Sequence, residues 1–150
     1  MWLDAVLAYL HFTAVFVLFA FLTVELMLAR AALDASAVRL LARVDLWYFG
    51  AALVTLATGF ARAIWGAKGW GFYAGDWVFH AKVTLFLAVA ALSIAPTLSI
   101  RRWRRLAGSG SAFAVPDEER ARLRRWLMWE VHVAAMIPVF AVVMARGLGR

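Results

Sequence analysis

Four apolar stretches divide this chain of 150 residues, and they constrain its fold more than any other feature. They cover roughly residues 3–28, 45–64, 78–100 and 126–145. About 20 helical residues cross a hydrocarbon core about 30 Å thick, so each stretch is long enough to span a bilayer. Backbone groups in lipid must be paired within the segment, so each span has to be an α-helix. The pattern predicts an all-α integral membrane bundle of four transmembrane helices, forming a single domain.

Composition agrees with a membrane protein and excludes several kinds of site. Hydrophobic residues make up 65% of the chain, whereas a soluble domain has roughly 45–50% apolar residues. There is no cysteine, which excludes disulfides, thiolate-bound iron–sulfur clusters and covalently attached haem. The net charge is +7, and the arginines flank the apolar stretches. We therefore expect anionic lipid head groups, and no nucleic acid, as partners.

The basic residues also predict the topology. Eleven of the 16 lysines and arginines lie between the first and second spans or in the loop 101–125. Because short cytoplasmic loops are enriched in such residues, these two connections are expected in the cytoplasm. Both termini then lie outside. The segment 34–44, just before the second span, is either a short helix at the membrane surface or a continuation of a neighbouring helix.

Several ionisable side chains fall inside the spans, where they are costly and face the bundle interior. His11 and Glu25 lie fourteen residues apart, which returns them to the same face of the first span. By depth these side chains form an outer layer and an inner layer. The outer layer comprises His11, His80, Lys82 and Arg62, and the inner layer comprises Glu25, Asp45, Glu130 and His132.

The outer layer suggests a haem site. Neutral imidazole is a natural axial ligand for haem iron, and four-helix bundles build such sites from facing helices. His11 and His80 are the candidate ligands, with iron bound through His11, and Arg62 or Lys68 are candidates to match the propionates. His80 and Lys82 lie about 200° apart around one helix, so either Lys82 reaches the surface or it faces inward with His80 near the head groups. The alternative is that both histidines are hydrogen-bonded structural residues.

The inner layer leaves two interpretations open. Glu25 and Glu130 either pair with Arg30, Arg43 or the arginines of the loop 101–125, or form a proton relay. The relay would suit a proton-coupled carrier.

Small residues recur at four-residue spacing on the second and third spans, at Ala51, Thr55 and Gly59 and at Ala91, Ala95 and Ser99. Such ladders let membrane helices pack closely, within the bundle or against a partner. The partner interpretation makes the chain a homo-oligomer or a non-catalytic accessory subunit of a membrane complex.

Residues spread over most of the chain resemble a bacterial membrane family catalogued as the domain of unknown function number 2214. The resemblance implies four helices and a multi-pass protein of the bacterial inner membrane, but no activity. It rests on His11, Glu25, Asp45, Gly59, Arg62, Lys68, Gly69, Phe72, Tyr73, Lys82, Ser93, Ile94, Pro96, Thr97 and Trp103.

A fainter resemblance links His11 and the run His80-Ala81-Lys82 to HemJ-type protoporphyrinogen oxidases and copper-resistance D-type membrane domains. It implies haem b and, if the chain is an enzyme, a haem-dependent membrane oxidoreductase. Lys82, Arg62 and Glu25 are then the candidate catalytic residues. The Leu-Pro-Arg stretch that ends the first span of those oxidases is absent, because this chain has Glu25-Leu-Met-Leu-Ala-Arg30 there.

Overall fold

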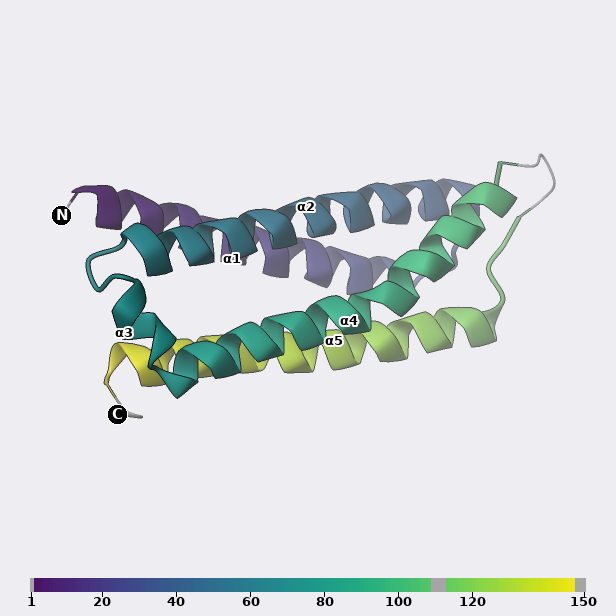
Figure 1. The fold of residues 1–150 in the computed structure, drawn as a ribbon. Coiled ribbons are helices and arrows are strands. Elements are labelled where there is room, and N and C mark those ends of the chain that lie inside the picture. The colour runs from purple at the N-terminus through teal and green to yellow at the C-terminus, as the bar shows by residue number, and fades with distance from the viewer. Residues whose placement is uncertain (1, 109–112, 148–150) are drawn as a thin grey trace.

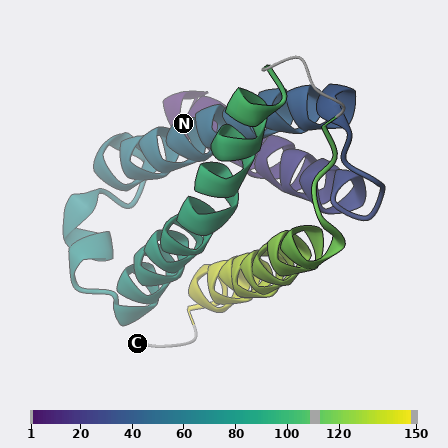
Figure 2. The same ribbon diagram turned by 90° about the vertical axis from the view of Figure 1, so that its right-hand side faces the viewer.

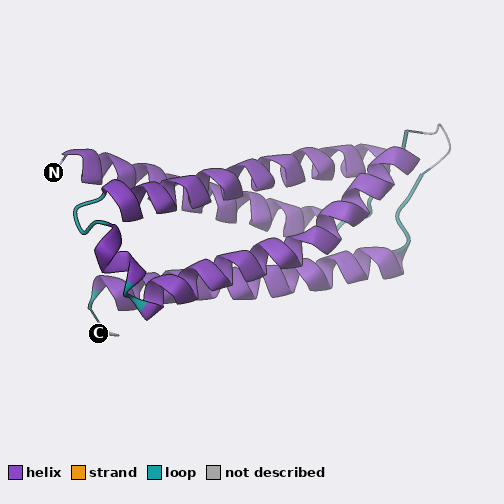
Figure 3. Ribbon diagram, in the orientation of Figure 1, coloured by secondary structure: helices purple, strands orange, loops and turns teal. Residues whose placement is uncertain are grey.

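The computed structural model describes residues 2–108 and 113–147, and within them it contains five helices and no strand (Figure 3). Residues 109–112, which belong to the predicted loop 101–125, lie outside the described part. Four of the helices are long and apolar enough to cross a membrane. This confirms the predicted all-α membrane bundle. The helices are α1 (Trp2–Leu28), α2 (Ala35–Trp65), the short α3 (Trp70–Ala74), α4 (Trp77–Leu106) and α5 (Asp117–Ala145).

The four long helices form two antiparallel hairpins (Figure 1). Helix α1 packs chiefly against α2, and α4 packs chiefly against α5. Both described ends of the chain lie at the same end of the bundle as α3, which we call the α3 end. We call the opposite end, formed by residues 29–34, 101–108 and 113–125, the arginine end. Both termini thus share one end, as an even number of spans requires.

Helix α2 is longer than the predicted span because the segment 34–44 continues it without a break. The carboxylate of Asp34 begins the helix, since its Oδ1 accepts hydrogen bonds of 2.8 Å from the N–H groups of Ser36 and Ala37. These bonds hold the pKa of Asp34 below its usual range. Such a cap satisfies N–H groups that have no partner within the helix.

The arginine end is closed by main-chain contacts between the hairpins and by a side-chain contact within the second hairpin. The N–H of Val115 donates to the carbonyl of Leu33 at 2.9 Å, beside an antiparallel bridge between Asp34 and Ala114. The indole of Trp103 donates to Glu119 at 2.7 Å, which ties the end of α4 to the start of α5. The main hydrophobic core extends to this end, and its members there include Leu33, Ile100, Trp103, Val115 and Leu127.

Helix α4 passes from one hairpin to the other along its length. Figures 1 and 2 show it beside α5 at the α3 end and turning toward the start of α2 at the arginine end. Pro96 lies within this helix, where proline removes one hydrogen bond and bends the backbone. In its second half α4 approaches α2, where the hydroxyl of Thr97 donates to Oδ1 of Asp45 at 2.6 Å.

Large apolar side chains cover the outside of the bundle. Trp2, Tyr9, Phe16, Trp47 and Trp129 are all more than 60% exposed. A soluble protein rarely exposes so much contiguous apolar surface, whereas hydrocarbon chains cover it at no cost.

Candidate functional site

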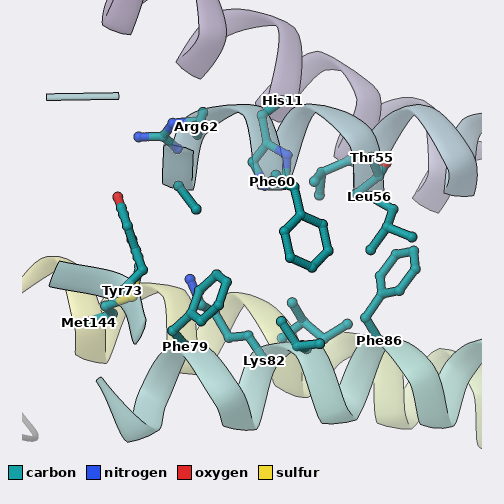
Figure 4. A pocket seen from close by; sticks show the side chains of 15 residues that line it. His11, Thr55, Leu56, Phe60, Arg62, Tyr73, Phe79, Lys82, Phe86 and Met144 are labelled. Carbon is teal, nitrogen blue, oxygen red and sulfur yellow. The ribbon is translucent and has the colours of Figure 1, made fainter. Parts of the chain in front are cut away.

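A pocket lies between the two hairpins at the α3 end (Figure 4). Three basic side chains from three helices line it: His11 of α1, Arg62 of α2 and Lys82 of α4. No acidic side chain is among the described residues of the lining. The other lining residues are aromatic, aliphatic or small, including Phe60, Tyr73, Phe79, Phe86, Ile137 and Met144. A mostly apolar cleft with a few convergent polar groups is the usual form of a small-molecule site.

The imidazole of His11 is held by α2. Its Nδ1 lies 3.1 Å from Oγ1 of Thr58, and the hydroxyl of Thr58 donates to the carbonyl of Val54 at 2.7 Å. Because that hydroxyl proton is already used, Oγ1 accepts from an N–H at Nδ1. Nε2 then carries the lone pair, as in histidines that bind metal while the other ring nitrogen donates to the protein.

Gly59 makes room for this imidazole. A Cβ at Gly59 would lie 3.1 Å from Cε1 of His11, which is closer than an ordinary contact, and 3.6 Å from its Nδ1. Glycine in a helix interior costs roughly 0.5–1 kcal/mol relative to alanine. The ladder of Ala51, Thr55 and Gly59 therefore packs inside the bundle, and its last member lies against the pocket histidine.

Arg62 and Lys82 face the pocket, and neither has an ion-pair partner among the described residues. The guanidinium of Arg62 lies 5.4 Å from the centre of the Phe12 ring, and its Nε is buried with no hydrogen bond. The ion pairs among the described residues, Arg102–Glu119 and Arg120–Asp117, lie at the arginine end. Buried Asp76 is within electrostatic range of Lys82, but its carboxylate accepts from the N–H of Val78. The pocket therefore has excess positive charge.

Two of the predicted haem residues lie outside this pocket. His80 is exposed, and its Nε2 lies 2.9 Å from the carbonyl oxygen of Ala74. The ammonium of Lys68 lies 4.3 Å from the centre of the Phe72 ring. Neither His80 nor Lys68 lines the pocket. Of the two arrangements predicted for α4, the structure therefore has the one in which Lys82 faces inward and His80 faces outward. The structure brings together His11, Arg62 and Lys82, but not His11 and His80.

A second polar cluster occupies the bundle interior toward the arginine end. The carboxyl groups of Glu25, Asp45 and Glu130 come from three different helices and are all buried. The hydroxyl of Tyr48 donates to Oε1 of Glu130 at 2.5 Å, and that of Thr97 donates to Oδ1 of Asp45 at 2.6 Å. Tyr48 lies three residues after Asp45 and so on the same face of α2, but this position in the sequence does not indicate Glu130 as its partner.

The predicted ion pairs of the inner glutamates are wrong. Neither Glu25 nor Glu130 pairs with an arginine anywhere in the described chain, and both Arg30 and Arg43 are exposed. His132, the fourth member of the predicted inner layer, is also exposed, with its Nδ1 2.6 Å from the carbonyl oxygen of Met128. The inner cluster therefore consists of carboxyl and hydroxyl groups.

Comparison with known proteins gives one match. The model of a family described as "Predicted membrane protein (DUF2214)" matches residues 3–149. No curated protein and no solved structure matches the chain.

Proposed function

The chain belongs to the DUF2214 family of predicted membrane proteins, and from that premise we propose that its pocket binds an anionic amphiphile within the membrane. The ligand class is a flat or branched apolar body that carries at least one acidic group. With the topology that the basic residues favour, the α3 end faces the outer side of a bacterial inner membrane. The pocket would then bind its ligand near the outer surface.

The observation that carries this proposal is the convergence of His11, Arg62 and Lys82 on a pocket without an acidic lining residue. Unpaired charges in low-dielectric surroundings cost several kcal/mol each, which an anion in the pocket offsets. The aromatic walls, from Phe60, Tyr73, Phe79 and Phe86, suit the apolar part of the same ligand. Charge and shape thus favour a single amphiphilic molecule over a small inorganic anion.

Haem b belongs to this ligand class. The polar residues of the pocket fit haem b with His11 as the one histidine ligand. His11 offers an imidazole whose Nδ1 is engaged by Thr58, and Arg62 and Lys82 would match the two propionates. Ligation by His11 together with His80 does not fit, because His80 is exposed and does not line the pocket. A bound haem would supply one-electron redox chemistry, which would make the chain a small membrane redox protein.

The visible spectrum of the protein tests the haem form directly. Protein purified in mild detergent from haem-replete cells is expected to give a reduced-minus-oxidised spectrum of haem b. His11→Ala should abolish this spectrum, and His80→Ala should preserve it. Loss of the spectrum in both variants would contradict the assignment of His11 as the sole histidine ligand.

A flat spectrum from the wild-type protein would remove haem and leave the broader ligand class. Mass spectrometry of small molecules extracted from the purified protein then decides. An acidic amphiphile at about one per chain, depleted in a variant with both Arg62→Gln and Lys82→Gln, supports the proposal. Equal recovery from the wild type and this variant overturns it.

A further inference from the structure

The carboxyl groups of the inner cluster are packed into the bundle interior, and none of them forms an ion pair with a described residue. Glu25 is 1% exposed, Glu130 is 0% exposed and Asp45 is 7% exposed. Glu25 is within electrostatic range of both Asp45 and Glu130, and Glu130 is within range of Asp45. Arg101 of α4 is the basic residue within range of the cluster, and it faces Asp45. Three like charges cannot all be held in so small a volume.

Two carboxyl oxygens of the cluster have no hydrogen-bond partner. Oε1 of Glu25 and Oε2 of Glu130 are both buried and unpaired, although Tyr48 satisfies the other oxygen of Glu130. Leaving an ionised carboxylate unpaired in an apolar interior costs several kcal/mol, and the usual outcome is neutralisation. In the described part of the chain, no group of three histidine, cysteine or acidic residues is arranged to hold a metal ion. A proton is the remaining ion that these two oxygens suit.

Asp45 gives the cluster access to the surface. It lines a second cavity, together with Arg101, Arg104 and Arg105, at the arginine end. Tyr48 lies on the same helix as Asp45, about one turn further into the bundle. The hydroxyl of Tyr48 donates a hydrogen bond to Glu130. Asp45 is within electrostatic range of Tyr48, Glu25 and Glu130, so exchangeable groups follow one another from the arginine-lined cavity to the unpaired oxygens.

We propose that Glu25 and Glu130 form a proton-binding site in the bundle interior, and that this site exchanges protons with the arginine end through Asp45. A proton arriving from solvent binds a carboxylate oxygen of Glu25 or Glu130 and leaves by the same route. Tyr48 and Arg62 lie fourteen residues apart on α2, about 21 Å along the helix, so the site is separate from the pocket. The proposal holds whether or not the pocket binds a ligand.

Infrared spectroscopy of the protein in lipid nanodiscs tests the site. At about neutral pH the wild type is expected to show the carbonyl stretch of a protonated carboxyl group. The band should lose intensity in Glu25→Gln or in Glu130→Gln, each of which replaces a carboxyl by an amide of the same shape. The matched control is Glu118→Gln, which makes the same change at an exposed position. Absence of the band in the wild type, or its persistence in both variants, would overturn the proposal.

The exchange route is tested by the rate at which the same band shifts when the nanodiscs are transferred to D₂O. Asp45→Asn should keep the band and slow its shift several-fold relative to the wild type. A shift as fast as that of the wild type would show that Asp45 is not on the route. Because the wild-type band is measured first, a variant that fails to fold does not decide the result.

Discussion

Tyr48 and Glu130 link two helices whose backbones do not meet. Their side chains are joined by a hydrogen bond of 2.5 Å, although they lie on α2 and α5 and 82 residues apart in the sequence. In the described chain, α2 contacts α1, α3 and α4, while α5 contacts α1 and α4. This bond therefore crosses the bundle diagonally, and together with the hydrogen bond from Thr97 to Asp45 it connects the two hairpins through side chains.

Replacing Tyr48 by phenylalanine should destabilise the bundle. The change leaves Oε1 of Glu130 without a donor in a fully buried position, which costs about 1–3 kcal/mol of unfolding free energy. Unfolding in detergent–SDS mixtures, followed by circular dichroism, measures this loss. Tyr9→Phe is the control, because Tyr9 is 70% exposed on the outside of α1. Equal stability of the two variants would mean that the diagonal bond contributes nothing.

Gly59→Ala should impair the pocket while leaving the bundle folded. The added methyl group meets the ring of His11 at 3.1 Å, so the imidazole must move by a few tenths of an ångström. We expect weaker binding of the pocket ligand, measured as lost haem absorbance or lost co-purified amphiphile per chain. Gly50→Ala is the matched control on the same helix, since a Cβ there meets nothing within 4 Å. That control should bind normally and be as stable as the wild type or slightly more stable.

The cap of α2 makes stability depend on pH through Asp34. Its pKa is lowered by the hydrogen bonds from Ala37 and Ser36, so the ionised form stabilises the folded state. This contribution is present above the unfolded-state pKa of about 3.9 and is lost as the pH falls through the lower folded-state value. Thermal unfolding between about pH 6 and about pH 3 should therefore show a steeper loss for the wild type than for Asp34→Asn, which caps without titrating. Identical slopes would contradict the prediction.

Arg62 and Lys82 should each strengthen binding of an acidic ligand, and Lys68 should not. Titration of haemin into ligand-free protein, followed by its absorbance, gives the dissociation constants. Arg62→Gln and Lys82→Gln should each weaken binding about tenfold or more, because a hydrogen bond to a charged group contributes about 1.5–3 kcal/mol. Lys68→Gln should bind like the wild type, since Lys68 lies on the Phe72 ring outside the pocket lining. A larger effect at Lys68 would place the acidic group elsewhere.

The spans and the inward position of most polar residues could be predicted from sequence, because both follow from local properties. Apolar length shows where a helix crosses, and the cost of burying charge shows that Glu25, Asp45 and Arg62 face inward. The helices extend beyond the predicted spans because alanine, leucine and arginine favour helix outside hydrocarbon as well. The segment 34–44 and the arginines up to Arg105 are examples.

The partners of these residues could not be predicted in the same way. Helical periodicity tells which face a residue occupies, but it does not tell which helix lies opposite. Glu25 has Arg30 nearby in sequence, yet Arg30 is exposed while Glu25 is 1% exposed among other carboxyl groups. The choice between His80 and Lys82 depends on how the turn at residues 74–76 sets the rotation of α4, and there the carbonyl of Ala74 receives His80.

The main-chain bridge between Asp34 and Ala114 decides where the molecule opens most easily. Separating the hairpins at the arginine end breaks the backbone hydrogen bond from Val115 to Leu33 and exposes the main core. Among the described residues, the buried apolar cluster at the α3 end is the small one of Ala63, Tyr73 and Phe79 with its few neighbours. The two hairpins are thus held together more firmly at the arginine end than at the α3 end. The pocket lies at this less tightly joined end of the bundle, between the two hairpins.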